Sequence, residues 1–457
     1  MTKFFLQINH RLTPPQYAVL SFGAVILAGS GVLTLPMMTT GPSLNFVDAL
    51  FMATSATCVT GLVVVDPGTG LTSLGQAVLL FLIQIGGLGI VLISTFFLVM
   101  TRQRLSVRTS DAVSGSFLKL RRYSLGLLVR RVVQLTLLLE TAGALLLFTR
   151  FYPDYGREAV WLSVFHSVSA FCNAGFSLFS DSLIRYADDP WVNVTVMVLI
   201  VLGGIGFFVI VDVWDSLRKG GDPAKRRLSF HSKIVLTVSG LLILLGAVLL
   251  FTLERESSLQ AYTTGGAWMR ALFQSVTART AGFNTIDISM LSDASLFTII
   301  LLMFVGGAPG SMAGGIKVTT LGVLMVIVFS GLRRTVSPGL FDRTVSRANL
   351  ERAIVLGIMA SMLVALGTLA LLVSERAGGA LPGARGDFLD LLFEGTSAFG
   401  TVGLSTGITS GLSAEGRLLI TLLMFVGRLG PLTLVYAIER RGAKASFRYP
   451  EEQILIG

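Results

Sequence analysis

The sequence has little charge and few of the residues that bind metals or form disulfides. Only 14% of its 457 residues are charged, compared with about 25% in soluble proteins. The two cysteines, Cys58 and Cys172, make no disulfide framework and no CxxC metal pattern, and the three histidines lie scattered along the chain. Because no hydrolytic, redox or metal-binding constellation is present in the sequence, we predict that the protein is not an enzyme.

Apolar residues, in contrast, make up 53% of the chain and occur in long blocks. These blocks reach the length of about 20 residues that a transmembrane helix needs, and the alternating segments of about 10 residues typical of a membrane β-barrel are absent. We therefore predict a multi-pass protein of the cell (inner) membrane, surrounded by membrane lipid. The surplus of basic residues gives a net charge of +10. Because these residues lie in loops between apolar blocks, we interpret them as a signal of membrane topology. We therefore predict that the protein does not bind nucleic acid.

A short motif occurs four times, and each copy ends at an equivalent glycine between two apolar runs. The four glycines are Gly61, Gly175, Gly282 and Gly403. The third copy has one fewer residue between Phe273 and its glycine than the other copies have at that place. An internal repeat of this kind, in a chain this apolar, predicts four similar units around one axis.

Each unit is predicted to contain a long helix, a short pore helix, an irregular loop and a second long helix. The stretches before the glycine motifs have about 10 to 14 residues and are too short to span a bilayer. The predicted fold class is therefore an all-α membrane protein with four parallel helix–pore helix–helix repeats and pseudo-fourfold symmetry around one ion pore. The predicted division of the chain is 1–15 (cytoplasmic N-terminus), 16–100 (repeat one), 101–122 (basic cytoplasmic linker), 123–215 (repeat two), 216–232 (basic cytoplasmic linker), 233–332 (repeat three), 333–348 (cytoplasmic linker), 349–437 (repeat four) and 438–457 (cytoplasmic C-terminal tail).

The loops between the units are basic, whereas the loops within each unit are more acidic. The positive-inside rule places the basic loops and both termini in the cytoplasm. Two crossings per unit then make the repeats parallel. The alternative function is an inverted-repeat secondary transporter of a small solute, which would need an odd number of crossings per repeat and a polar midplane pocket. A purely structural assembly subunit would not need four glycine-rich loops.

The glycine motifs predict irregular loops at membrane depth, which must be buried in protein or line water. Glycine allows positive φ and close backbone approach, so four loops around an axis can aim carbonyl oxygens at a dehydrated cation. A single such glycine could merely break a helix; four equivalent copies favour a selectivity filter. The candidate filter residues are Thr57, Cys58, Val59, Thr60, Gly61, Cys172, Asn173, Ala174, Gly175, Thr280, Ala281, Gly282, Gly400, Thr401, Val402 and Gly403.

A second glycine cluster follows each motif, and the third cluster is exceptional. The stretch Gly306–Gly315 contains five glycines and Pro309, and no helix runs undisturbed through such a stretch. We predict that this helix breaks into an intramembrane loop that lines a cavity. The other clusters are milder, and the second long segment of unit two is expected to run from Trp191 to Trp214. A phosphate-binding loop does not fit, because Ile316 stands where that motif needs lysine.

Arg428 replaces a glycine of the fourth cluster, inside an apolar run. A buried charge at this depth is costly and is a functional candidate by default. We predict that Arg428 repels cations or pairs with the intramembrane loop; a structural pairing with a carboxylate or with carbonyls is the alternative. Lys317 either snorkels to the cytoplasmic side or takes part in gating, and Glu140 is expected to be a structural partner. The candidate gate residues are Gly306, Gly307, Pro309, Gly310, Ser311, Gly314, Gly315, Lys317 and Arg428.

The four-unit arrangement and the glycine motifs resemble the Trk/Ktr/HKT superfamily of potassium transporters over nearly the whole chain. The first long segment begins near Gln16, which leaves no room for two extra N-terminal helices, and the tail Arg448–Gly457 resembles that of Ktr-branch membrane subunits. In this superfamily a filter glycine in each repeat accompanies a preference for K⁺, so the resemblance implies K⁺ uptake. It also implies that the loop Gly306–Gly315 is the gate.

The resemblance further implies partners that the residues alone do not indicate. These are a second copy of the chain in a homodimer and an octameric cytosolic ring of KtrA-type regulatory subunits. The resemblance implies Na⁺ as an activator of K⁺ uptake, as in a symporter. Adenine nucleotides would act only through the ring.

Overall fold

The computed structural model describes residues 13–102, 125–218, 228–333, 339–341, 343–376, 387–431 and 433. Most of these residues are helical, which confirms the predicted helical class. The predicted N-terminal segment up to residue 12, most of the first basic linker and the whole C-terminal tail with its Arg448–Gly457 motif lie outside the described residues.

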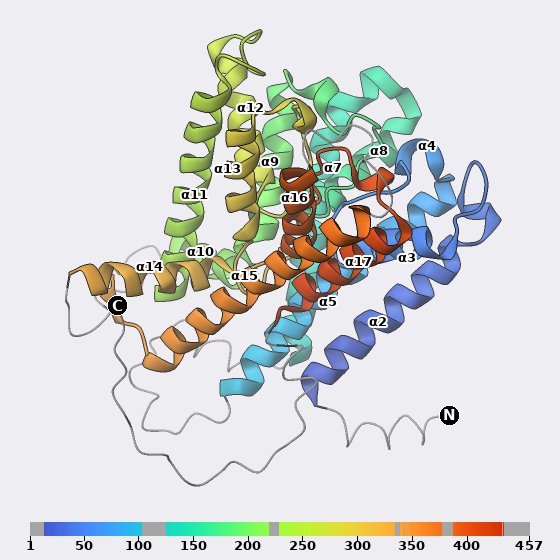
Figure 1. Ribbon diagram of the computed structural model, residues 1–457. Helices are drawn as coiled ribbons and strands as arrows, with labels where there is room; N and C mark the ends of the chain where they lie inside the picture. The colour runs from blue at the N-terminus through green and yellow to red at the C-terminus, as the bar shows by residue number, and fades with distance from the viewer. Residues whose placement is uncertain are drawn as a thin grey trace, which may run out of the picture.

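Long and short helices alternate along the chain (Figure 1). The long first helices of the four predicted units are α2 (Pro14–Leu33), α7 (Leu125–Tyr155), α11 (Phe230–Glu254) and α15 (Arg347–Arg376). The short helices are α3 (Phe46–Thr57), α8 (Ala159–Phe171), α12 (Thr264–Thr277) and α16 (Asp387–Gly400). The second helices are α5 (Ser73–Arg102), α9 (Pro190–Ile205) with α10 (Phe207–Arg218), α13 (Asp293–Phe304) with α14 (Val318–Leu332), and α17 (Ala414–Leu429).

Shorter elements connect these helices. They are α4 (Pro67–Gly70) and the 3₁₀ turns η1 (Pro36–Met38), η3 (Gly156–Glu158), η4 (Ile184–Tyr186), η5 (Ile288–Met290) and η6 (Thr409–Gly411). An antiparallel hairpin of β1 (Gly339–Leu340) and β2 (Arg343–Thr344) lies in the predicted third linker, where the sequence indicated no strand.

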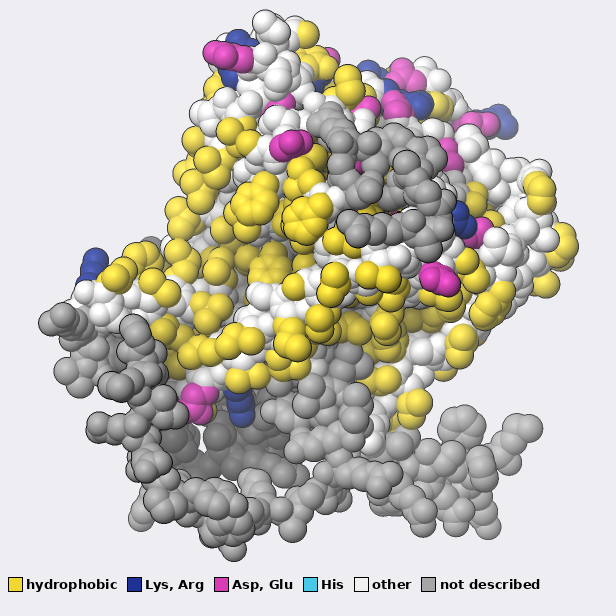
Figure 2. Space-filling view, viewed as in Figure 1, with side chains coloured by type: hydrophobic (Ala, Val, Ile, Leu, Met, Phe, Trp, Pro, Cys, Tyr) yellow, Lys and Arg dark blue, Asp and Glu magenta, His cyan; other side chains and the backbone are white. Residues whose placement is uncertain are grey.

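The surface and the helix lengths fit a protein that lies in a bilayer. Within the described residues, four stretches are long and apolar enough to cross a membrane, and the bent pair α9–α10 would make a fifth. These four stretches contain most of α2, α7, α11 and α15. Figure 2 shows hydrophobic side chains over the middle of one face, while charged side chains gather toward its upper edge. Exposed leucines of α11, such as Leu244, and exposed residues of α15, such as Ile358 and Met362, contribute to this apolar surface.

One aromatic side chain anchors each short helix in the core. Phe51, Phe165, Phe273 and Phe393 are all fully buried. Phe273 lies nine residues before its glycine, whereas the other three lie ten residues before theirs. The third copy is therefore one residue shorter between its buried phenylalanine and its glycine, so the backbone of this loop has to differ from that of the other three.

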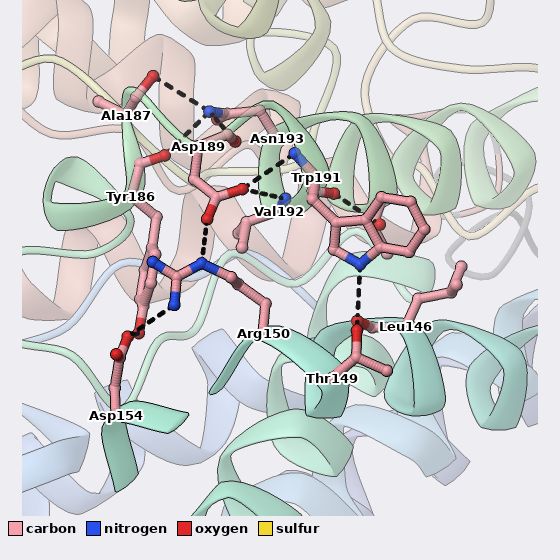
Figure 3. Close-up of polar contacts among 11 residues, drawn as sticks. Leu146, Thr149, Arg150, Asp154, Tyr186, Ala187, Asp189, Trp191, Val192 and Asn193 are labelled. Atoms are coloured by element: carbon pink, nitrogen blue, oxygen red, sulfur yellow. Dashed lines mark hydrogen bonds and ion pairs between the residues drawn. The ribbon is translucent and has the colours of Figure 1, made fainter. Parts of the chain in front are cut away.

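Polar contacts join the end of the first helix to the start of the second helix in units two, three and four. In unit two, Asp189 caps α9 by accepting hydrogen bonds from the Trp191 and Val192 N–H groups at 2.9 and 3.2 Å (Figure 3). Its other carboxylate oxygen accepts from Arg150 of α7. Aspartate is a preferred N-cap because its oxygen pairs with helix N–H groups that otherwise lack partners.

A similar contact joins the two helices in units three and four, but there the carboxylate belongs to the first helix and the capping serine to the second. Glu254 accepts hydrogen bonds from the Ser292 backbone N–H at 2.9 Å and hydroxyl at 2.6 Å, and Ser292 caps α13. Glu375 accepts from the Ser413 hydroxyl at 2.8 Å, and Ser413 caps α17. These contacts fix where each second helix begins, and therefore where it passes the glycine loop.

The second glycine cluster breaks its helix, contrary to our expectation of one segment from Trp191 to Trp214. Helix α9 ends at Ile205, Gly206 has a φ of 86°, and α10 leaves at a bend of 101°. The cause lies elsewhere in the chain. The Gly203 and Gly204 carbonyls accept hydrogen bonds from Met312 and Ala308, at 3.1 and 2.9 Å, instead of from the next helical turn.

The fourth cluster also ends a helix, because Gly430 adopts a φ of 82° immediately after α17. In unit one, by contrast, α5 continues through its cluster to Arg102. In unit three the predicted break is present, and α13 and α14 run in different directions on either side of it (Figure 1). The glycine clusters thus have four different outcomes, set by what packs against each one.

Replacing Glu254 by alanine tests whether these contacts hold the second helices. The change removes two hydrogen bonds that the half-buried Ser292 donates to a carboxylate, so we expect a loss of about 1–3 kcal/mol in the free energy of unfolding. The measurement is thermal unfolding of the purified protein in detergent. Glu256→Ala is the matched control, since Glu256 is exposed two residues away. Equal melting temperatures for both variants would contradict the assignment.

Candidate ion pathway

Four loops with the same backbone bend follow the four short helices. In each loop a residue with positive φ stands two positions before the predicted glycine, which itself has positive φ. The pairs are Val59 (56°) and Gly61 (98°), Asn173 (58°) and Gly175 (69°), Thr280 (70°) and Gly282 (78°), and Thr401 (50°) and Gly403 (92°). Non-glycine residues in this region are uncommon and mark strain or function. The bend occurs four times despite different side chains, so packing imposes it.

One N–H group in each loop turns back to the short helix that precedes it. The hydrogen bonds are Thr60 N–H to Ser55 O at 2.8 Å, Ala174 to Ser169 at 2.7 Å, Ala281 to Thr277 at 2.9 Å, and Val402 to Ser397 at 2.8 Å. Further N–H groups donate to serine hydroxyls, as Gly61 does to Ser55 and Gly403 to Ser397, both at 3.1 Å. These N–H groups are thereby engaged within their own unit.

The four glycines close a ring. A side-chain carbon added at each glycine would meet the carbonyl oxygen that precedes the glycine of a neighbouring loop: Ala174 O for Gly61, Ala281 O for Gly175, Val402 O for Gly282, and Thr60 O for Gly403. The contacts run through all four loops and return to the first. A ring of closely approaching carbonyls leaves no room for a β-carbon, which explains the four glycines.

The remaining predicted filter residues lie at the ends of the short helices. Thr57 ends α3, and Cys58 and Cys172 cap α3 and α8; all three are buried. Gly400 is the last residue of α16. Glycines of the second helices pack directly against these ends: an added carbon at Gly86 would collide with the Thr57 carbonyl. Gly203 and Gly427 make the same close approach to the carbonyls of Phe171 and Phe399.

The third loop contains a buried charge to which the sequence analysis gave no role. Arg279 directly precedes Thr280 and is only 7% exposed. Its Nη2 donates to the Gly306 carbonyl at 2.9 Å and lies 3.4 Å from the Ser239 hydroxyl. A charged residue three positions before a predicted filter glycine is the sequence signal that could have identified it.

The predicted gate loop is a closed segment of chain. The Gly306 N–H donates to Ile316 O at 2.8 Å and the Val318 N–H donates to Gly307 O at 3.0 Å, which pins the two ends of the loop together. Gly310 and Gly315 have φ values of 75° and 61°. The loop is buried over most of its length, and its backbone groups find partners within the protein, as the interior of a membrane protein requires.

The two predicted gate cations both donate to carbonyls of this loop. Arg428 donates from Nη1 to Met312 O and from Nη2 to Gly86 O, the latter at 3.0 Å, and is 3% exposed. The Lys317 Nζ donates to Ala313 O at 2.6 Å. Arg428 thus links the fourth unit to the loop of unit three and to α5 of unit one. Both contacts are to backbone carbonyls, so they match the predicted pairing with the loop as well as the structural alternative of a pairing with carbonyls.

A polar cluster lies behind the second loop. Glu140 of α7 accepts a hydrogen bond from the Gln84 Nε2 of α5 at 3.1 Å, and the Cys172 thiol lies 3.7 Å from its other carboxylate oxygen. The Ser167 hydroxyl donates to the Glu140 carbonyl at 2.6 Å. Within the described part of the chain, no group of three or more His, Cys, Asp or Glu residues could hold a metal ion.

Ion pairs and hydrogen bonds join neighbouring units around the outer rim. Arg270 of α12 donates to Asp188 at 2.8 Å, and this contact keeps the pKa of the Asp188 carboxyl below its ordinary value. Arg417 of α17 donates to Asp48 of α3 at 2.5 Å. The Trp161 indole of α8 donates to Gln76 of α5 at 2.8 Å. Several of these residues belong to the short helices α3, α8 and α12, so these contacts hold the short helices, and the glycine loops that follow them, in position relative to one another.

Comparison with known proteins is consistent with this geometry. A family profile described as TrkH, cation transport protein, matches residues 16–445. The Ktr system potassium uptake protein B of Vibrio alginolyticus is 38% identical over 97% of this chain and 95% of its own length. The potassium/sodium uptake protein NtpJ of Enterococcus hirae is 35% identical over 100% of both chains. These matches confirm the resemblance indicated by the motifs, and they agree with the prediction that the chain is not an enzyme.

The fold is similar to that in a crystal structure of the potassium transporter TrkH from Vibrio parahaemolyticus. The TM-score is 0.72, the match covers 92% of this chain and 83% of that chain, and the sequences are 19% identical. At this identity the likeness concerns the fold alone.

Replacing Gly403 by alanine tests the ring. The new carbon would collide with the Thr60 carbonyl, so we expect ion transport to be lost. Gly407→Ala is the matched control, because Gly407 has a φ of 98° but nothing within 4 Å of an added carbon. Both changes cost about 1–3 kcal/mol of backbone strain, and only the first affects the ring. Equal loss of ion flux into membrane vesicles in both variants would show that strain, and not the ring, explains the result.

Proposed function

The chain belongs to the TrkH family of cation transport proteins, and on that premise we propose that it mediates K⁺ uptake through the four-loop ring. The observation that carries the proposal is the closed ring of contacts among Gly61, Gly175, Gly282 and Gly403. The related proteins of Vibrio alginolyticus and Enterococcus hirae are named as potassium and potassium/sodium uptake proteins. Their names support K⁺ as the transported ion.

The proposed chemistry is replacement of the hydration shell of the ion by backbone carbonyls. The carbonyls of Thr60, Ala174, Ala281 and Val402 lie against the glycines of neighbouring loops. Carbonyl dipoles at fixed positions can compensate a weakly hydrated cation for the loss of its water. The short helices end at the loops, so their partially negative C-terminal ends add to the favourable potential. Pseudo-fourfold symmetry of the four units around the ion path is part of this proposal, and the closed ring of glycine contacts supports it.

The gate is proposed to be the loop Gly306–Gly315. Its location next to the filter supports this, since an added carbon at Gly314 would collide with Thr401, and one at Gly306 would lie 3.2 Å from the Thr280 methyl group. Arg428 donates to the middle of the loop. Movement of the loop relative to Arg428 would alter both the width and the positive charge of the path.

The finer features of the system are proposed from the family resemblance. They comprise a homodimer, a KtrA-type cytosolic ring that binds adenine nucleotides, activation by Na⁺, and cytoplasmic termini. The basic linkers and C-terminal tail supply positive charge on the side where a cytosolic ring would dock. The word sodium in the name of the Enterococcus relative supports testing Na⁺ as an activator.

Expression in a bacterium that lacks its own K⁺ uptake tests the proposed function. Together with a KtrA-type partner, the protein should restore growth at low K⁺ and drive K⁺ uptake. Gly282→Ser should reduce the preference for K⁺ over Na⁺, because its side chain would displace the Val402 carbonyl. The matched control is Gly41→Ser, since Gly41 is exposed and has nothing within 4 Å of an added carbon.

Two results would overturn the proposal. One is no K⁺ uptake by a correctly inserted protein in the presence of the partner. The other is an unchanged ratio of K⁺ to Na⁺ uptake in Gly282→Ser. Uptake of a small organic solute in place of either ion would favour the alternative of a secondary transporter.

A further inference from the structure

Arg279 is a buried cation in a filter loop, and its surroundings supply hydrogen-bond acceptors but no described ion-pair partner. It stands directly before the bent residue of the third loop, where the other loops have Cys58, Cys172 and Gly400. Its Nη1 is buried without a hydrogen-bond partner. Burial of a charge without full compensation is costly, so the position is difficult to explain by packing alone.

The partner of Arg279 is the first residue of the gate loop. Gly306 O accepts from Arg279 Nη2 at 2.9 Å, and the Gly306 N–H makes the 2.8 Å hydrogen bond that closes the base of the loop onto Ile316. The Gly306 carbonyl therefore joins the loop to Arg279, and the N–H group of the same residue closes the base of the loop. If the base of the loop opens, the Gly306 carbonyl moves and Arg279 loses its acceptor.

Three cations bind three carbonyls of this one loop. Lys317 holds Ala313 from the end of the loop itself, and Arg428 holds Met312 from the fourth unit. Arg279 differs from both because it is part of a filter loop. Its neighbour Thr280 has a φ of 70° and precedes the ring carbonyl of Ala281. Any shift of the third loop when an ion binds is therefore transmitted directly to the Arg279 backbone.

We propose that Arg279 is a positioning residue that couples ion occupancy of the third filter loop to the mobility of the gate loop. This inference rests on the proposed function, because it takes the ring as the K⁺ site and the loop as the gate. K⁺ in the ring fixes the backbone at Thr280, the fixed backbone holds the guanidinium, and the guanidinium holds Gly306. Arg428 restrains the same loop without sensing the ion.

Hydrogen–deuterium exchange of the purified full-length protein tests the coupling. Exchange in the peptide that covers residues 305–317 is measured in KCl and in choline chloride. We expect K⁺ to slow this exchange in the unaltered protein. In Arg279→Gln, exchange should be about tenfold faster, as expected for a lost hydrogen bond to a charged group, and equal in the two salts.

Arg428→Gln is the matched comparison. It removes another clamp on the same loop, so exchange should also become faster, but K⁺ should still slow it. A peptide from α15 reports whether the fold is intact in each variant. Should Arg279→Gln fail to accumulate, Arg279→Lys carries the test, because lysine is shorter and lacks the planar fork of arginine.

The possible outcomes separate the inference from the function on which it rests. If the unaltered protein transports K⁺ and Arg279→Gln retains the K⁺ effect on exchange, Arg279 is only a packing residue and the inference is wrong. If the unaltered protein transports K⁺ but its loop exchange does not respond to K⁺, the inference is also wrong. Absence of K⁺ transport by the unaltered protein would instead contradict the proposed function.

Discussion

The need to satisfy backbone polar groups away from water governs this structure. Irregular backbone at membrane depth is tolerated only where protein or a water-filled path supplies partners. In the four glycine loops, N–H groups such as that of Thr60 return to the preceding short helix, while the carbonyl of the same residue meets the ring. The loops can therefore present oxygen atoms to an ion while these N–H groups keep their partners inside the protein.

The same constraint explains why the units are not identical. The gate loop of unit three takes the carbonyls of Gly203 and Gly204 as acceptors for its own N–H groups. Helix α9 then loses the hydrogen bonds that would continue it, and the chain bends at Gly206. One broken helix thus causes a second break in the neighbouring unit. Under the proposed function, features that all four loops have in common serve ion coordination, and features that differ among the units surround the gate.

The sequence predicted the parts of this arrangement that local chemistry determines. The four glycines and the interruption at Pro309 were identified because glycine and proline impose their backbone preferences wherever they occur. The bend at Gly206 was not predictable, since the similar cluster at Gly86 lies within a continuous helix and the difference comes from tertiary hydrogen bonds. Arg279 was missed because its acceptor, Gly306, is 27 residues away and becomes adjacent only in the folded chain.

Diffraction with Rb⁺ or Tl⁺ in place of K⁺ tests the central claim most directly. Both ions scatter strongly and are close in size to K⁺, so their anomalous signal locates the ion site independently of transport assays. The account predicts peaks on the axis of the four loops, within coordination distance of the carbonyls of Thr60, Ala174, Ala281 and Val402. Peaks found only elsewhere in the protein, with none inside the ring, would contradict it.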